Sequence, residues 1–189
     1  MSGGIIALIV VVVIVLIAVF WYIATRNGII ASRNRVEESW SGIDVQLKRR
    51  HDLIPNLVNT VKGYATHEQQ VFEAVTKARA DAMATPDNVA QTAEAEGNLN
   101  RAMADLRAVA EQYPDLKATE NFQQLSRNLS ELEDEIQASR RIYNSNVQSY
   151  NTKIQQFPAS IVANQGNFEE KEFFEITDAA ERDTPSVSF

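Results

Sequence analysis

The sequence predicts an all-α protein, with a single N-terminal transmembrane helix followed by an antiparallel up-and-down bundle of about four helices. Three observations favour this fold class. Twenty consecutive apolar residues begin at Ile5, and past Gly28 apolar side chains recur at the three- and four-residue spacing of helices. The chain has 189 residues but only seven glycines and five prolines, which is few for a turn-rich β protein.

The apolar block from Ile5 to Ala24 predicts a membrane-spanning helix. At about 1.5 Å per residue it is ~30 Å long, which matches the hydrocarbon core of a bilayer. Only a helix satisfies its own backbone in that medium, and aromatic side chains at one end favour the membrane interface. The residues that we expect to face lipid include Ile5, Leu8, Val12, Leu16, Phe20, Trp21, Tyr22 and Ala24.

A cleaved signal peptide and a buried core helix are the alternatives for this block. A signal peptide has a basic start, a core of ~7–15 apolar residues and a small-residue cleavage site. Residues 1–4 contain no basic side chain, and the apolar block is longer than such a core. Core helices rarely exceed ~14 wholly apolar residues. We therefore expect a retained single-pass anchor in the lipid bilayer.

The basic residues after the anchor predict its orientation. Arg26, Arg33 and Arg35 lie just beyond its C-terminal end, and positive flanks remain in the cytoplasm. We therefore expect a short N-terminus outside the cytoplasmic (inner) membrane and the C-terminal domain in the cytoplasm. The expected domains are an anchor (1–25), a helical bundle (26–176) and an acidic, mobile tail (177–189).

Charge and cysteine content exclude several classes of function. The net charge is −7, and residues 81–189 hold nine Lys and Arg against nineteen Asp and Glu. A nucleic-acid binder needs a basic face to displace counterions, so we expect no nucleic-acid partner. The absence of cysteine excludes disulfides, thiolate nucleophiles and Cys-ligated metal sites.

The first helix of the bundle carries an apolar stripe in which Arg50 is the exception and Pro55 predicts a kink, because proline lacks an N–H donor. Gly63 is expected to end this helix in the left-handed conformation. The sequence from Thr66 to Gln69 then matches a capping box, which marks a new helix. One helix continuing to about Ala84 is the alternative. The stripe consists of Val36, Trp40, Ile43, Leu47, Ile54, Leu57 and Val61.

Two further long helices follow the interruption at residues 85–88. The first carries apolar residues from Val89 to Tyr113 and is closed by Pro114. The second starts near Thr119, keeps its apolar stripe to Phe157 and is stopped by Pro158.

Beyond Gly166 the composition becomes aromatic and acidic. We expect a short helix there that docks Phe168, Phe173 and Phe174 on the bundle. At the end of the chain, Val187 and Phe189 are candidates for binding a partner that captures C-termini; a frayed tail is the alternative.

Three stretches resemble the LemA family. They are residues 39–64, which begin SWSGIDVQLKRR, residues 113–118 and residues 143–158. The resemblance covers residues 5 to about 176. It implies an antiparallel helical bundle held at the bacterial cytoplasmic membrane by one N-terminal helix, with no known catalytic activity. It also implies a link to internal membranes in some relatives and to a membrane metalloprotease in others.

Tyr143, Asn144, Tyr150 and Asn151 form a seven-residue repeat on one side of the last long helix. Such residues pack helices together through hydroxyl and amide hydrogen bonds to neighbouring helices. A ligand pocket or a surface between subunits is the alternative interpretation.

The basic run from Lys48 to His51 lies about 36 Å beyond Ala24 on a straight helix, which is too far for contact with lipid headgroups. Pairing with acidic helices of the same chain is therefore expected. Arg50 needs a carboxylate if it is buried. Glu68 and the acidic run from Glu131 to Glu135 are both candidates.

No motif predicts an enzyme, a metal site or a cofactor. His51 and His67 are the only histidines and do not have the H-E-x-x-H spacing of zinc proteases. We find no G-x-S-x-G sequence, P-loop or G-x-G-x-x-G sequence. The preferred hypothesis is a non-enzymatic scaffold that forms homo-oligomers. An adaptor for a membrane protease and an enzyme using buried Tyr, Asn and Arg side chains are the alternatives.

Overall fold

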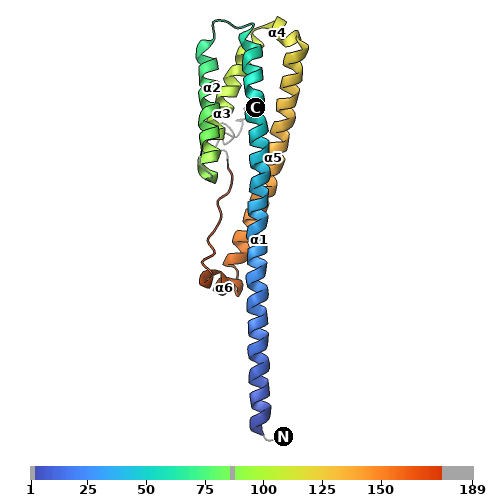
Figure 1. Ribbon diagram of the computed structural model, residues 1–189, viewed down its shortest axis with the longest axis vertical. Helices are drawn as coiled ribbons and strands as arrows, with labels where there is room; N and C mark the ends of the chain where they lie inside the picture. Colours follow the sequence, from blue (N-terminus) through green and yellow to red (C-terminus); the bar gives the residue numbers. More distant parts are fainter. Residues whose placement is uncertain (1–2, 86–87, 176–189) are drawn as a thin grey trace, which may run out of the picture. The chain divides into compact units, whose positions relative to one another are not determined.

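The computed structural model describes residues 3–85 and 88–175, and this part of the chain is helical without strands. The predicted all-α fold with one long apolar N-terminal helix is confirmed. The helices are α1 (Gly3–Lys62), α2 (Gln69–Ala84), α3 (Val89–Glu111), α4 (Pro114–Ala118), α5 (Glu120–Gln155) and α6 (Ala159–Gln165) (Figure 1).

The described residues divide into two compact units, and α1 and α5 contribute to both. The larger unit contains residues 41–143 and 172–175, and the smaller contains residues 3–40 and 144–171. In the larger unit, short connections join α1, α2, α3 and α5, so that consecutive helices are antiparallel neighbours. Its core contains Ile54, Leu57, Val61, Phe72, Val75, Leu99, Met103, Leu106, Leu116, Leu125 and Leu129.

The smaller unit joins the N-terminal part of α1 to the end of α5 and to α6. Asn146 of α5 donates to the carbonyl of Arg35, and the Lys153 ammonium donates to the carbonyl of Gly28 at 2.7 Å. From Asn146 to Lys153 the chain advances seven residues along α5, while the contacted residue moves seven residues back along α1, from Arg35 to Gly28. The two helices are therefore antiparallel here. Its buried apolar residues are Ile29, Val36, Val147, Tyr150, Ile154, Val162 and Ala163.

The connection between α1 and α2 corrects two predictions and confirms one. The predicted break near Gly63 is confirmed, because α1 ends at Lys62. The left-handed conformation of Gly63 was wrong, since no described glycine has a positive φ. The capping box was also wrong. The N-cap of α2 is Glu68, which makes no side-chain cap, so Thr66 lies outside the helix. Pro55 lies inside α1 without ending it.

The C-terminal part of the described chain differs from the sequence prediction. Phe157 was placed on the packed stripe, but α5 ends at Gln155 and the Phe157 side chain is 82% exposed. The short helix expected after Gly166 does not form in the described residues, where residues 167–175 are extended or irregular. Phe174 is nevertheless fully buried, while Phe173 is exposed.

Candidate functional site: a buried ion cluster and an apolar anchor

A cluster of charged side chains lies inside the larger unit and centres on Arg50 of α1. The Arg50 side chain is only 2% exposed. Its guanidinium donates to Glu96, to the Asn100 side-chain oxygen at 2.8 Å and to Glu133 at 2.9 Å. Glu96 and Asn100 are one helical turn apart on α3, and Glu133 is on α5. The three acceptors therefore connect three helices through one side chain.

Only one of the predicted partners of Arg50 is found in this cluster. Glu133 belongs to the acidic run at residues 131–135, whereas Glu68 is the half-buried N-cap residue of α2. Glu96, which is fully buried, was not among the predicted partners. The sequence feature that could have identified Glu96 as a buried partner was its position seven residues before Met103, on the apolar stripe of α3. An acidic residue at such a position needs a buried cation.

The neighbouring His51 is buried and faces the same carboxylate. Its Nε2 lies 2.8 Å from a Glu96 oxygen, and because a carboxylate only accepts, Nε2 carries the proton. Burial, followed by the charges of Arg50 and Arg79, lowers the pKa of His51 to about 4. The charges of Asp52 and Asp44 oppose this lowering without reversing it. His51 is therefore a neutral hydrogen-bond donor at pH 7.

Arg79 of α2 joins the fourth long helix to the cluster. Its Nε donates to the backbone carbonyl of His51 at 2.6 Å. Side chains from α1, α3 and α5 and this bond from α2 thus meet at one level of the bundle. Because Arg50 and Glu96 are buried and pair with one another, we expect the arrangement to fix the register of the helices.

Lys48 and Arg49, which precede Arg50 in the basic run, remain at the surface. Lys48 pairs with Asp44 on its own helix, at 2.7 Å, and this pairing raises the pKa of Lys48. Arg49 lies 3.8 Å from Glu135. Exposed pairs of this kind contribute little to stability. Arg50 and His51 are the members of the basic run that the bundle buries.

Three residues of the seven-residue repeat, Tyr143, Tyr150 and Asn151, bind an extended segment of the chain. In the smaller unit, the Tyr150 hydroxyl donates to the Glu169 carbonyl at 3.0 Å. Asn151 donates to the Lys171 carbonyl and accepts from the Lys171 N–H, each at 2.9 Å. This double hydrogen bond gives Lys171 the partners that a strand would supply.

In the larger unit, the Tyr143 hydroxyl donates to the Glu172 carbonyl at 2.9 Å. Burial raises the pKa of Tyr143 to about 12, so the hydroxyl remains protonated and keeps this role as donor. The Arg140 guanidinium lies 5.5 Å from the centre of the Phe174 ring, within cation–π distance. These contacts hold the segment that contains the buried Phe174.

The remaining residues that were predicted to be functional differ in their burial. Trp40, Pro55 and Asn144 are half-buried. Val187 and Phe189 lie outside the described residues. No group of three or more His, Cys, Asp or Glu side chains that could hold a metal occurs in residues 3–85 and 88–175.

A groove of about 230 Å³ lies between α1, α3 and α5 in the larger unit. Leu57, Leu106, Phe122 and Leu129 line it, together with the cluster residue Glu133. Pockets for small-molecule ligands usually measure ~300–1,000 Å³. The groove is smaller than that range.

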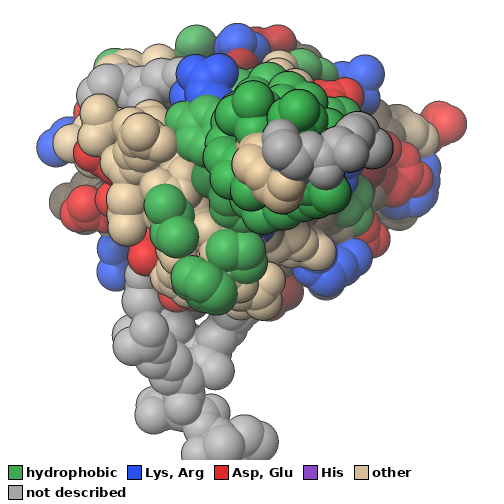
Figure 2. Space-filling view, turned by 90° about the horizontal axis from the view of Figure 1, so that it is seen from below, with side chains coloured by type: hydrophobic (Ala, Val, Ile, Leu, Met, Phe, Trp, Pro, Cys, Tyr) green, Lys and Arg blue, Asp and Glu red, His purple; other side chains and the backbone are tan. Residues whose placement is uncertain are grey.

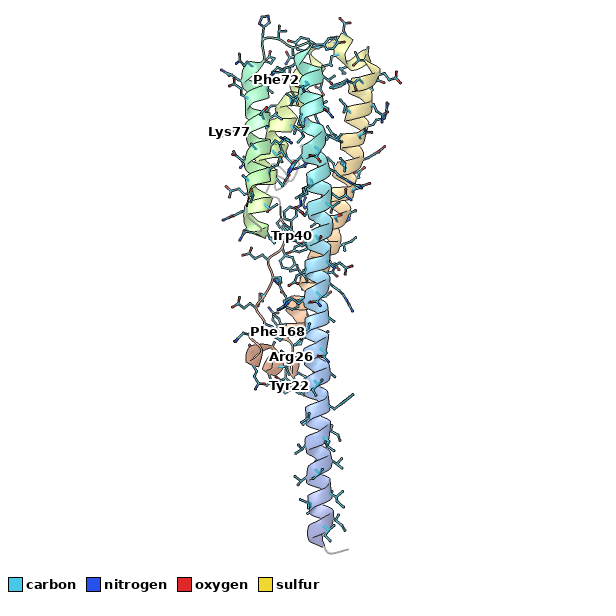
Figure 3. All side chains as sticks on the ribbon, in the orientation of Figure 1. Tyr22, Arg26, Trp40, Phe72, Lys77 and Phe168 are labelled. Carbon is cyan, nitrogen blue, oxygen red and sulfur yellow. The ribbon has the colours of Figure 1, made fainter. Side chains whose placement is uncertain are left out.

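The N-terminal part of α1 is a candidate membrane anchor. In the part of the chain that the structure describes, α1 alone is long and apolar enough to cross a membrane, with a mean hydropathy of 3.4 in its most apolar window and none of that window buried. Tyr22 is the first half-buried side chain along α1, and Ile29 is the first fully buried one. Arg26, Arg33 and Arg35 are exposed. Protein packing therefore begins where the apolar stretch ends (Figure 3).

Comparison with known proteins gives a consistent family. The model of the LemA family matches residues 39–189, which is more than half of the chain. Protein LemA of Metamycoplasma hominis is 29% identical over 144 residues, which are 76% of this chain and 66% of that protein, just under two thirds of its length. Magnetosome protein MamQ 2 of Paramagnetospirillum magneticum is 24% identical over 98% of this chain and 77% of its own length. Magnetosome protein MamQ of Magnetospirillum gryphiswaldense is 22% identical over 86% and 68%, respectively. The chain belongs to the LemA family.

Proposed function

We propose that this protein is a non-enzymatic, membrane-anchored scaffold whose helical bundle organises proteins or membrane by forming homo-oligomers. The observation that supports it best is the exposed apolar stretch of α1, which continues without a break into a bundle whose buried Arg50 and Glu96 pair with one another. In this proposal residues 1–25 form the anchor, residues 26–176 the bundle and residues 177–189 a tail.

The similarity to relatives supports an anchor that is retained in the functional protein. The match to magnetosome protein MamQ 2 extends over 98% of the chain, so it includes the apolar stretch as well as the bundle. By analogy with the name of that relative, we propose that the bundle acts at a membrane surface. Its partners would be lipid, further copies of this chain and other membrane proteins.

We further propose that the bundle lies in the bacterial cytoplasm. Arg26, Arg33 and Arg35 follow the anchor, and no acidic residue precedes Glu37. Protease added to inverted vesicles should therefore digest the bundle and leave a short membrane-protected fragment. Right-side-out vesicles are the matched control and should protect the bundle. Complete protection of the bundle in inverted vesicles would contradict this orientation.

An adaptor or regulator of a membrane protease is the second candidate function. The observation that favours it is the exposed Phe173, which lies in an extended segment next to the buried Phe174. An apolar side chain on extended backbone can dock on a partner by strand addition. This function requires a stoichiometric hetero-complex, whereas the scaffold requires many copies of one chain.

The size and composition of the full-length protein in mild detergent distinguish these functions. We expect light scattering, corrected for detergent, to give a defined homo-oligomer and mass spectrometry to find only this chain. A monomer or dimer that carries a second membrane protein in fixed ratio would support the adaptor and contradict the scaffold. A monomer alone would contradict both proposals under those conditions.

A further inference from the structure

An exposed apolar patch lies on the smaller unit, separate from the anchor in sequence. Phe157 is 82% exposed and Ile161, in α6, is 56% exposed. Two other residues of α6, Val162 and Ala163, are buried and hold the helix in place. Figure 2 shows the end of the molecule with the anchor toward the viewer, and a smaller group of hydrophobic side chains lies beside it.

The contacts between α1 and α5 set the depth of this patch along the anchor. Asn146 contacts Arg35 and Lys153 contacts Gly28, so each step along α5 toward its C-terminus corresponds to an equal step back along α1. Continued to the end of α5, this register places Gln155 opposite Arg26, and Phe157 follows two residues later in the turn before α6. In Figure 3, Tyr22 and Arg26 lie at the height of α6 along α1. Ala24 is where the apolar stretch ends.

The positions of the acidic residues in the sequence also bear on this patch. The protein is acidic, with 25 Asp and Glu, yet none occurs before Glu37 and none between Glu135 and Glu169. Residues 3–36 and 144–168 of the smaller unit are therefore free of acidic side chains, whereas Glu169 and Glu170 follow them, and the Gln155 amide donates to the Glu170 carboxylate at 2.7 Å. The anionic headgroups of a bacterial membrane attract basic side chains such as the exposed Arg26.

We propose that Phe157 and Ile161 insert into the headgroup region of the bilayer, so that α6 and the turn before it form a second, interfacial membrane contact. The proposal rests on the membrane anchor proposed above, because the anchor sets the depth at which the patch meets lipid. Aromatic and aliphatic side chains are stabilised at this depth, and two contacts fix the tilt of the smaller unit where one helix alone would leave it free.

The chain contains no cysteine, so single cysteines can be introduced for site-specific labelling. The test variants are Phe157→Cys and Ile161→Cys. The matched control is Ser145→Cys, at an exposed position of α5 that is farther from the anchor. Ile14→Cys reports on the anchor itself. Each full-length variant is labelled with an environment-sensitive fluorophore and reconstituted in vesicles containing phosphatidylglycerol, with nitroxide-labelled lipids as quenchers.

We expect lipids with a shallow nitroxide to quench labels at residues 157 and 161 several-fold more than the label at residue 145. Lipids with a deep nitroxide should quench the label at residue 14. If residue 14 is quenched but residues 157 and 161 behave like residue 145, the interfacial contact is refuted and the anchor stands. If residue 14 is not quenched, both proposals fail. Cross-linking between two Phe157→Cys chains without lipid quenching would assign the patch to a second copy and refute the lipid contact.

Discussion

Replacement of Arg50 by methionine is expected to lower the free energy of unfolding by about 3–5 kcal/mol. Methionine keeps much of the volume of the arginine stem but removes the charge that neutralises the fully buried Glu96. Glu96 would then retain one hydrogen bond, from His51. Because native proteins are stable by only ~5–15 kcal/mol, this loss is a large fraction of the total. Denaturant titration of the full chain in detergent, followed by circular dichroism, measures it.

Lys48→Met is the matched control for this prediction. Lys48 lies two residues before Arg50 on α1 and loses an equal charge, but its side chain is exposed and pairs only with Asp44 of the same helix. We expect no measurable change in stability. A double variant, Arg50→Met with Glu96→Gln, should recover about 1–3 kcal/mol relative to the sum of the single variants. Equal midpoints for Arg50→Met and Lys48→Met would contradict the role of the cluster.

The regular part of this fold could be predicted from sequence because its causes are local. The apolar residues of α1 recur with the period of a helix, and the structure buries Val36, Ile43 and Leu47 as that period requires. The long apolar helix that is the candidate anchor was predicted from length and hydropathy alone. The end of α1 at Lys62 was also predictable, although the reason given for Gly63 was wrong.

The cluster could be predicted only in part, because it depends on which helices become neighbours. Arg50 on an apolar stripe indicated a buried charge, but its partners are 46 and 83 residues away in sequence. The position of Glu96 on the stripe of α3 was a usable signal, since two opposite charges on two apolar stripes can pair inside a bundle. Choosing between Glu68, Glu96 and Glu133 required the arrangement of the helices.

The conformation of the extended segment after Gly166 could not be predicted from sequence, for a different reason. Its aromatic residues correctly suggested docking, since Phe174 is fully buried, but not the conformation. A helix satisfies its own backbone, whereas here Asn151 supplies both hydrogen bonds to Lys171 and Tyr143 donates to Glu172. Side chains of α5 thus replace the internal hydrogen bonds of a helix. Nothing in the local sequence around Lys171 reveals these distant donors and acceptors.

The second large effect is a dependence of stability on pH that arises from His51. In the folded protein its pKa is lowered from the ordinary 6.5 to about 4, mainly by burial and then by Arg50 and Arg79. The unfolded chain therefore binds a proton as pH falls through 6.5, while the folded chain binds it only near pH 4. His51 thus stabilises the fold fully above pH 6.5, and this contribution is lost as pH falls to 4. The lost free energy of unfolding is at most about 3 kcal/mol.

Comparison with His51→Gln isolates this contribution, because a glutamine amide can still donate to Glu96 but does not titrate. Asp44, Asp52, Glu96 and the other carboxylates remain in both proteins, so their own titrations largely cancel in the difference. Between pH 6.5 and 4, we expect the natural chain to lose about 3 kcal/mol more stability than the variant. His67→Gln, at an exposed histidine, should follow the natural chain. If the stabilities of the natural chain and His51→Gln fall in parallel over this range, the folded bundle does not lower the pKa of His51, and this prediction is wrong.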